Sequence, residues 1–345
     1  MPSEQEPRPT ESGNGPPTMA DVGRLAGVSA MTVSRALKGN AHIAKGTLER
    51  ILSAVDELGY VLDQSAGSLS SRRSGFIAAI VPSIDNSNFA DTARGITDAL
   101  AQTSMQLLFG YTNYSVAREE ELIESMLRRR PEGIILTGGE HTPRARTMLA
   151  NAGIPVIETW DVPETPINAV VGFSNADAME ALVDSLVTQG YSRFGFIIGT
   201  VASDARGRQR HIGFDRALLR HGLSNNRVVS VESTPMRMAH GAEAIRQLLR
   251  NFPDTDVAVC VGDLPAFGAM MECRRMGLSM PGDIAIAGFG DYEIASISEP
   301  GITTVNVDAY GIGQQAAEQM IAMLEDRSAA TTIRTNYQVL LRGST

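Results

Sequence analysis

Short apolar segments alternate with amphipathic segments from Phe76 to the end of the 345-residue chain. The expected strands form two series, over 76–84, 105–111, 133–137 and 154–160, and then over 169–173, 194–200, 228–232, 257–261 and 284–289. Helical patterns lie between or after them, over 119–130, 176–188, 241–250 and 310–324. Such alternation favours βαβ units and therefore parallel sheets covered by helices. The two series predict two α/β lobes with a cleft at the carboxyl ends of the strands, where such sheets usually bind ligands.

The first 75 residues follow a different pattern. Residues 1–17 contain five Pro and almost no apolar side chains, which is typical of a disordered tail. Residues 18–60 predict three short helices: the first is capped by Thr18 and Asp21, the second is capped by Ser29 and covers 30–37, and the third covers 47–58. A tight glycine turn between the first two indicates a helix-turn-helix unit. Residues 61–75 have the composition of a linker.

The charge is unevenly distributed along the chain. The formal net charge is −9, of which 1–17 contribute −2, 18–75 contribute +2 and 76–345 contribute −9. A slightly basic segment, 18–75, followed by an acidic one, 76–345, permits DNA binding without establishing it. The run Arg128–Arg130 is interpreted as a helix C-terminus that complements the helix dipole.

Several classes of protein are excluded or disfavoured. No apolar run is long enough to cross a membrane and the N-terminus is polar, so we expect a cytoplasmic protein. Cys260 and Cys273 stand alone, which excludes a disulfide scaffold and a CxxC metal site. No nucleophile–base or zinc motif is visible. We therefore expect no enzyme activity, no cofactor and no metal.

The second predicted helix carries side chains suited to DNA. Small hydroxyl groups suit phosphate oxygens, as do the amides at a helix N-terminus. Arg can donate two hydrogen bonds to guanine, and Met can contact a thymine methyl group. We expect Ser29, Thr32 and Ser34 to face phosphates and Ala30, Met31 and Arg35 to face base edges.

The segment Asp21-Val-x-x-x-Ala26-Gly-Val-Ser29-x-x-Thr32-Val-Ser34-Arg35, with Glu57-Leu-Gly-Tyr60, closely resembles the LacI/GalR family of bacterial transcription regulators. The resemblance implies a homodimer that reads a near-palindromic operator, with Arg35, Met31 and Ala30 in the major groove. It implies phosphate contacts by Thr18, Ser29, Thr32, Ser34, His42 and Thr47, and a minor-groove wedge at Leu69. The linker departs from the family pattern at Leu62, Asp63 and Gly67, which predicts a weak hinge helix and modest operator affinity.

The resemblance continues through Ile80-Val-Pro82-Ser83, Arg210-x-x-Gly213-Phe214 and Ala287-Gly-Phe-Gly-Asp291 to the C-terminus. It implies an α/β fold class: a three-helix headpiece followed by a two-lobed core like that of periplasmic binding proteins, with parallel sheets. The chain would cross between lobes near Gly172, Pro300 and Thr332. Lobe 1 would then hold about 76–172 and 301–332, and lobe 2 about 173–300 and 333–345. The tetramer-forming leucine repeat of some members is not present before Thr345, so a dimer is expected.

More narrowly, Glu140-His141-Thr-Pro-Arg144 and Val171-Gly-Phe173-x-Asn175 resemble the gluconate-operon repressors of that family. The resemblance and the strand ends together predict an effector site of Ser83, Thr137, His141, Arg144, Asp161, Phe173, Arg206, Arg210, Asp263 and Asp291. Arg206 and Arg210 lie four residues apart on a helix, and a bidentate Arg–carboxylate pair suits a sugar acid such as gluconate. Two family positions that bind neutral sugars are changed, before Asp263 and at Gly290, which disfavours a pyranose.

Three alternatives stay open. The chain could respond to another sugar, a sugar phosphate or a corepressor. A solute-binding protein would leave residues 18–60 unexplained, and an enzyme would need a catalytic cluster in the cleft. No sequence pattern indicates whether the effector releases the operator or promotes its binding. None indicates the operator sequence or the regulated genes.

Overall fold

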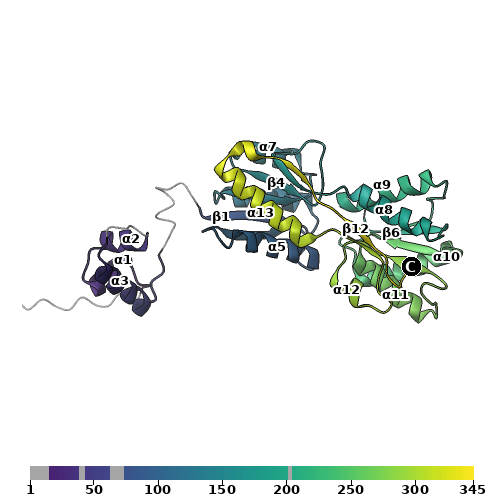
Figure 1. Cartoon of the computed structure of the whole chain (residues 1–345), viewed down its shortest axis with the longest axis horizontal. Coiled ribbons are helices and arrows are strands. Elements are labelled where there is room, and N and C mark those ends of the chain that lie inside the picture. Colours follow the sequence, from purple (N-terminus) through teal and green to yellow (C-terminus); the bar gives the residue numbers. More distant parts are fainter. Residues whose placement is uncertain (1–14, 39–42, 63–73, 201–203) are drawn as a thin grey trace, which may run out of the picture. The chain divides into compact units, whose positions relative to one another are not determined.

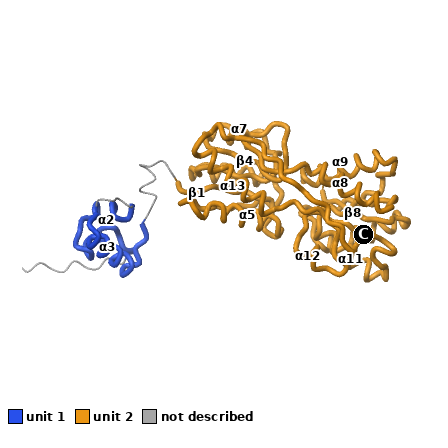
Figure 2. Tube along the Cα trace, in the orientation of Figure 1, with its two compact units in different colours: residues 1–72 blue, residues 73–345 orange. Residues whose placement is uncertain are grey.

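The computed structural model describes residues 15–38, 43–62, 74–200 and 204–345. The chain divides into two compact units, residues 1–72 and 73–345 (Figure 2). We call the described part of the first unit the headpiece and residues 74–345 the core.

The headpiece is built from three helices, α1 (Met19–Ala26), α2 (Ala30–Leu37) and α3 (Lys45–Leu58). The Thr18 hydroxyl accepts from the Asp21 amide and the Asp21 carboxylate accepts from the Thr18 amide, which confirms the predicted capping box. Ser29 caps α2 in the same way through the Thr32 amide at 3.2 Å. A Cβ atom at Gly23 would lie 2.8 Å from the Val28 carbonyl oxygen, so the tight turn between α1 and α2 requires glycine there. One small apolar core joins the three helices: Val22, Ala26, Val33, Ala36, Ile51 and Ala54.

The first lobe of the core is a six-stranded parallel sheet in the order β11-β5-β4-β3-β1-β2 (Figure 1). Its strands are β1 (Phe76–Val81), β2 (Gln106–Tyr111), β3 (Gly133–Thr137), β4 (Val156–Thr159), β5 (Ala169–Gly172) and β11 (Thr332–Arg334). Its helices are α5 (Ser87–Leu100), α6 (Val116–Leu127), α7 (Pro143–Asn151) and α13 (Ala309–Glu325). Because side chains alternate along a strand, Ile77 and Ala79 pack toward α5 and α13, whereas Ala78 and Ile80 pack toward α6 and α7.

The second lobe has a four-stranded parallel sheet in the order β7-β6-β8-β9 and an antiparallel pair, β10 with β12. The strands are β6 (Phe194–Ile198), β7 (Val228–Ser230), β8 (Val257–Cys260), β9 (Ala285–Ala287), β10 (Thr304–Asn306) and β12 (Gln338–Leu340). The helices are α8 (Asn175–Thr188), α9 (Ala205–Arg220), α10 (Met238–Asn251), α11 (Asp263–Arg275) and α12 (Glu293–Ile297). A bridge between Ala287 and Thr303 attaches the antiparallel pair to the parallel sheet.

Of the three chain crossings between lobes, the first lies at the predicted position, and the second and third lie beyond theirs, Pro300 and Thr332. The first follows β5 at Gly172, where a Cβ atom would lie 2.5 Å from the Asp161 carbonyl oxygen. The second was predicted near Pro300, but β10 still pairs with β12 of the second lobe. The crossing therefore falls between Asn306 and Ala309, and the third falls between Arg334 and Gln338.

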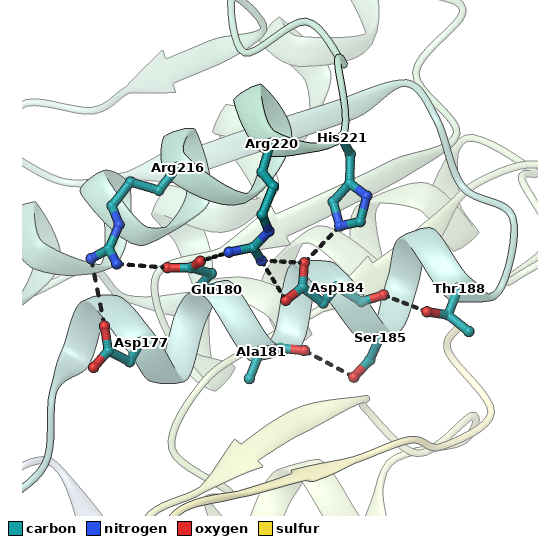
Figure 3. A network of polar contacts seen from close by, with 9 residues as sticks. All are labelled: Asp177, Glu180, Ala181, Asp184, Ser185, Thr188, Arg216, Arg220 and His221. Atoms are coloured by element: carbon teal, nitrogen blue, oxygen red, sulfur yellow. Dashed lines mark hydrogen bonds and ion pairs between the residues drawn. The ribbon is translucent and has the colours of Figure 1, made fainter.

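Helices α8 and α9 are joined by a surface network of charges (Figure 3). Arg216 lies 3.1 Å from Glu180, and Arg220 lies 2.6 Å from Asp184. The network is exposed, so each pair contributes little to stability. The packing of α8 against α9 depends more on Gly213, because a Cβ atom there would lie 2.0 Å from the Ala176 carbonyl oxygen.

Several elements are shorter or shifted relative to the predictions. The strand predicted over 76–84 ends at Val81 because Pro82 has no amide to donate to a ladder. The helix predicted over 119–130 runs from Val116 to Leu127, because the Ser115 hydroxyl caps it by accepting from the Arg118 amide at 3.2 Å.

Candidate functional site: a headpiece surface and an interlobe cleft

The second headpiece helix presents the predicted DNA-reading side chains to solvent. Ala30, Met31 and Arg35 are exposed, and Met31 is 66% exposed, which is unusual for a large apolar side chain. Met31 and Arg35 lie one turn apart and therefore share a face of α2. An apolar side chain beside a guanidinium on one exposed face suits a groove that presents methyl groups and acceptors.

The predicted phosphate-contact residues lie around that face, and some hydroxyl groups already have partners. Thr18 donates to Asp21 at 2.6 Å, and the hydroxyls of Ser29 and Thr32 lie 2.9 Å apart. Ser34 on α2 and Thr47 in the first turn of α3 are half-buried. His42 and Leu69, and with them Asp63 and Gly67 of the linker, lie outside the described residues.

Two adjoining cavities lie between the lobes of the core, with Tyr114 and Asp204 in the walls of both. They hold about 580 and 660 Å³ of space, part of it open to solvent. Of the predicted effector residues, Thr137 and Arg206 line the first cavity and Ser83 and Arg210 line the second.

Arg206 is the most unusual of these residues. It is only 7% exposed, and its guanidinium carbon lies over the Phe89 ring, 5.3 Å from the centroid. Within the described residues no carboxylate lies within ion-pair distance of it. The charge of Asp161 acts on it without a direct ion pair, and a buried cation gains from an anion at contact distance.

Arg210 lies one turn further along α9 and is held in place by neutral groups. It donates to the Asn175 side chain at 3.0 Å and to the Val261 carbonyl at 2.7 Å. Its guanidinium carbon lies 3.8 Å from the centre of the Phe289 ring. None of these partners is an anion, and the negative charge that acts on it most strongly is that of Asp204 in the wall of the same cavity.

Two carboxylates of the predicted effector site, Asp161 and Asp263, are buried and have different hydrogen-bond partners. Asp161 accepts from the Val162 amide at 2.9 Å, and burial raises the pKa of Asp161. Asp263 is fully buried, and burial raises its pKa to about 6 although Thr304 and the Tyr292 amide donate to it. Asp263 therefore fixes the turn that carries Tyr292 into the cleft. Neither Asp161 nor Asp263 lines either cavity, contrary to the prediction.

Phe173 and Asp291 also support the cleft from outside the cavities. Phe173 is 1% exposed and stacks on Phe289, the ring under Arg210. Asp291 is paired with Arg342 at 2.7 Å and accepts from Asn306 at 2.8 Å. Its carboxylate is therefore occupied by protein groups.

The structure places His141 and Arg144 away from the predicted site. The His141 side chain has no exposed surface and lies between Glu119 and Glu158, so it points into the first lobe. Arg144 is exposed on α7 and pairs with Glu120 at 2.8 Å and Glu124 at 2.6 Å. Both predictions extrapolated from the strand end at Thr137, but the two side chains turn toward the acidic residues of α6.

Several residues that line the cavities were not predicted from the sequence: Asn86, Tyr114, Glu140, Asp204 and Tyr292. Tyr114 follows the carboxyl end of β2, so the strand-end rule could have found it. Tyr292 follows the strand predicted over 284–289 by three residues, so the same rule could have found it, and it meets Asn86 of the other lobe at 2.5 Å.

Neither a metal site nor a membrane span is found in the described parts of the chain. No group of three or more His, Cys, Asp or Glu side chains there could hold a metal ion. Of the described helices, none is both long enough and apolar enough to cross a membrane.

Comparison with known proteins agrees with this architecture. Residues 18–63 match the model of bacterial regulatory proteins of the lacI family, and residues 183–345 match the periplasmic binding protein-like domain. The HTH-type transcriptional regulator GntR of Pseudomonas aeruginosa is 34% identical over 333 residues, which are 96% of each chain. This chain belongs to the LacI family. It is a DNA-binding transcriptional regulator with a helix-turn-helix headpiece and an α/β core.

Other LacI-family proteins extend the likeness over nearly the whole length. The regulator GntR of Escherichia coli K12 is 33% identical over 312 residues, 90% of this chain and 93% of that protein. The crystal structure of a LacI-family transcriptional regulator from Silicibacter pomeroyi is 34% identical and covers 95% of this chain and 99% of its own, with a TM-score of 0.88. The predicted fold class, including the parallel sheets and the periplasmic-binding-protein-like core, is confirmed.

Proposed function

We propose that this LacI-family regulator represses genes of sugar-acid catabolism and releases its operator when gluconate or a close relative binds in the interlobe cleft. The observation that carries the proposal is the Arg206 guanidinium, which is buried in the wall of the first cavity with no carboxylate partner among the described residues. A ligand carboxylate would supply the missing partner through a bidentate pair.

The remaining cavity groups suit a hydroxylated chain attached to that carboxylate. Thr137 and Asp204 line the first cavity, and Ser83 and Asn86 line the second. Hydroxyl groups both donate and accept hydrogen bonds, so they can satisfy carboxylate, amide and hydroxyl partners alike. Arg210 offers a second cation, which also makes a sugar phosphate the first competitor to include in a test.

Operator binding is assigned to the exposed face of α2. Arg35 is placed to donate to guanine, and Met31 to contact a thymine methyl group. We propose that Ala30 lies with them in the major groove, while Thr18, Ser29, Thr32, Ser34 and Thr47 position the headpiece on phosphates. A homodimer would present two such headpieces to a near-palindromic operator.

Contacts between the lobes supply a route from effector to operator. Asn86 meets Tyr292 at 2.5 Å and Asn88 donates to the Gly290 carbonyl at 2.8 Å, each pair joining the first lobe to the second. A ligand that lies beside these pairs favours one lobe arrangement over another. Its effect on DNA affinity equals its differential affinity for the two arrangements, typically about 1–3 kcal/mol.

The deciding experiment is titration calorimetry of the full chain with gluconate, idonate, glucose and gluconate 6-phosphate. We expect heat with the sugar acids and none with glucose. Binding of glucose alone would contradict the sugar-acid assignment, and binding of the phosphate alone would assign the cleft to sugar phosphates. Sedimentation of the same sample tests the dimer.

A further inference from the structure

We propose that Arg129 and Arg130 of the core bind DNA at a second place, on phosphates that flank the operator bases read by the headpiece. The inference rests on operator binding by the headpiece as proposed above. It concerns a surface of the core, outside the cleft and outside the helix-turn-helix.

The two side chains are exposed on an otherwise acidic part of the chain. Their neighbour Arg128 pairs with Glu124, but over the described ranges no acidic group lies within ion-pair distance of Arg129 or Arg130. They belong to the one run of three consecutive basic residues in the sequence, on a segment, 76–345, whose net charge is −9. An acidic surface repels DNA, so an isolated basic spot on it marks where DNA could approach.

The backbone at Arg130 allows its charge to be removed cleanly. Helix α6 ends at Leu127, and the amides of Arg129 and Arg130 donate to the Met126 and Leu127 carbonyls, so Arg128–Arg130 form the C-terminus of the helix as predicted. Arg130 adopts a φ of 55°, the left-handed conformation in which glycine is favoured. A glycine at this position therefore removes the charge and suits the backbone.

These residues lie where the core chain leaves for the headpiece. The Gly75 amide donates to the Glu132 side chain at 3.2 Å, and the Glu132 amide donates to the Phe76 carbonyl at 2.9 Å. Arg130 therefore lies two residues before Glu132, which contacts the start of β1. The loop after α6 and Gly75 therefore lie at the same edge of the sheet.

The covalent linker limits the distance between this edge and the headpiece. From Tyr60, at the end of the headpiece, to Gly75 there are 15 residues. Even fully extended, such a segment spans at most about 50 Å. We infer that attachment of the headpiece to its operator raises the local concentration of Arg129 and Arg130 around the flanking duplex. Because salt screens charges beyond about 8 Å at physiological ionic strength, the arginines must touch the phosphates directly.

The test uses the full chain and a duplex selected from random sequence by the wild-type protein. That site is presented with short flanks or with about ten additional base pairs, roughly one helical turn, on each side. Arg130→Gly suits the left-handed backbone and removes the charge, and Arg129→Gln removes the second charge. Arg118→Gln is the matched control, because Arg118 is exposed at the opposite end of the same helix and pairs with Glu121.

We expect wild type and Arg118→Gln to bind the long duplex several-fold more tightly than the short one. The double variant Arg129→Gln/Arg130→Gly should bind both duplexes equally while its thermal stability is preserved. The salt dependence, log K against log salt, should become shallower by about 1 for each phosphate that is no longer neutralised. Unchanged base preference on the short duplex would show that the headpiece still works.

Equal flank effects and equal salt slopes in the double variant and the control would overturn the proposal. So would a wild-type protein that binds the two duplexes alike. If the slope changes equally on both duplexes, the arginines act on the linker or headpiece and not on flanking DNA, which also contradicts it. Failure of the sugar-acid assignment would appear only in calorimetry, so it can be distinguished from failure of the proposed contact with flanking DNA.

Discussion

The Nδ1 atom of His141 lies 2.6 Å from a carboxylate oxygen of Glu119, on the far side of the first-cavity wall. A second carboxylate, that of Glu158, lies 3.4 Å from Nε2, and neither His141 nor Glu158 has exposed side-chain surface. The arrangement is a buried imidazolium between two carboxylates, which joins α6, the loop after β3 and β4. It thus anchors one wall of the first cavity from behind.

The first prediction concerns the pH dependence of stability. Burial alone would lower the pKa of His141, but the hydrogen bond to Glu119 and the charges of Glu119 and Glu158 outweigh burial and raise it to about 9. Because the folded-state pKa is above the unfolded value of 6.5, the stabilisation is complete below pH 6.5 and is lost as pH rises through 9. Melting temperatures of wild type should therefore fall as the pH is raised from about 7 to about 10.

His141→Gln should be less stable at neutral pH and should lose most of that pH dependence. Removing one partner of a buried charged group typically costs about 3–5 kcal/mol. His221→Gln is the control, since the His221 side chain is 33% exposed and pairs with Asp184 on the surface. If His141→Gln and His221→Gln melt alike at both pH values, the buried imidazolium plays no part in stability.

The second prediction concerns effector binding. Arg206→Gln keeps a hydrogen-bond donor and removes the charge that the proposed carboxylate needs. A charge-assisted hydrogen bond contributes about 1.5–3 kcal/mol, so the affinity for gluconate should fall roughly ten- to hundredfold. Calorimetry measures the change.

Arg216→Gln is the matched control, because Arg216 lies on the same helix and pairs outward with Glu180. It should leave gluconate binding unchanged. Equal affinities for wild type and Arg206→Gln would remove the argument that the buried guanidinium binds the effector.

Much of this architecture was readable from the sequence because it depends on local signals. Strand–helix alternation predicted the two lobes, and Thr18 and Ser29 predicted two helix starts. The resemblance to the LacI/GalR family implied the positions of Arg206 and Arg210 in the cleft, and their four-residue spacing predicted that they share one face of a helix.

What the sequence did not predict depends on contacts between distant segments. His141 is drawn away from the cleft by Glu119 on α6 and Glu158 on β4. Tyr292 enters the cleft because a buried carboxylate, Asp263, fixes its amide at 2.8 Å. The second crossing lies beyond Pro300 because β10 is completed by β12 near the C-terminus.

The third prediction concerns the packing of α5 against α13. A Cβ atom at Gly313 would lie 2.0 Å from the Thr92 carbonyl oxygen, so Gly313→Ala forces the helices apart. Overpacking of this kind typically costs about 1–3 kcal/mol, although alanine favours an isolated helix. Urea unfolding should show the loss, whereas Gln314→Ala at the neighbouring exposed position should not. A fully stable Gly313→Ala protein would contradict the close approach.

The last prediction concerns base recognition by α2. Arg35→Ala should lose discrimination at one base pair in each half-site, at a cost of roughly 1–3 kcal/mol, because a bidentate interaction with guanine is removed. Selection from random duplexes with the variant and with wild type measures the change as a relaxed position in the recovered site. Arg50→Ala, which removes an equal charge from the exposed surface of α3, should lower affinity without relaxing any position. Recovery of an unchanged site by Arg35→Ala would refute the assigned role, since a phosphate contact alone carries no base preference.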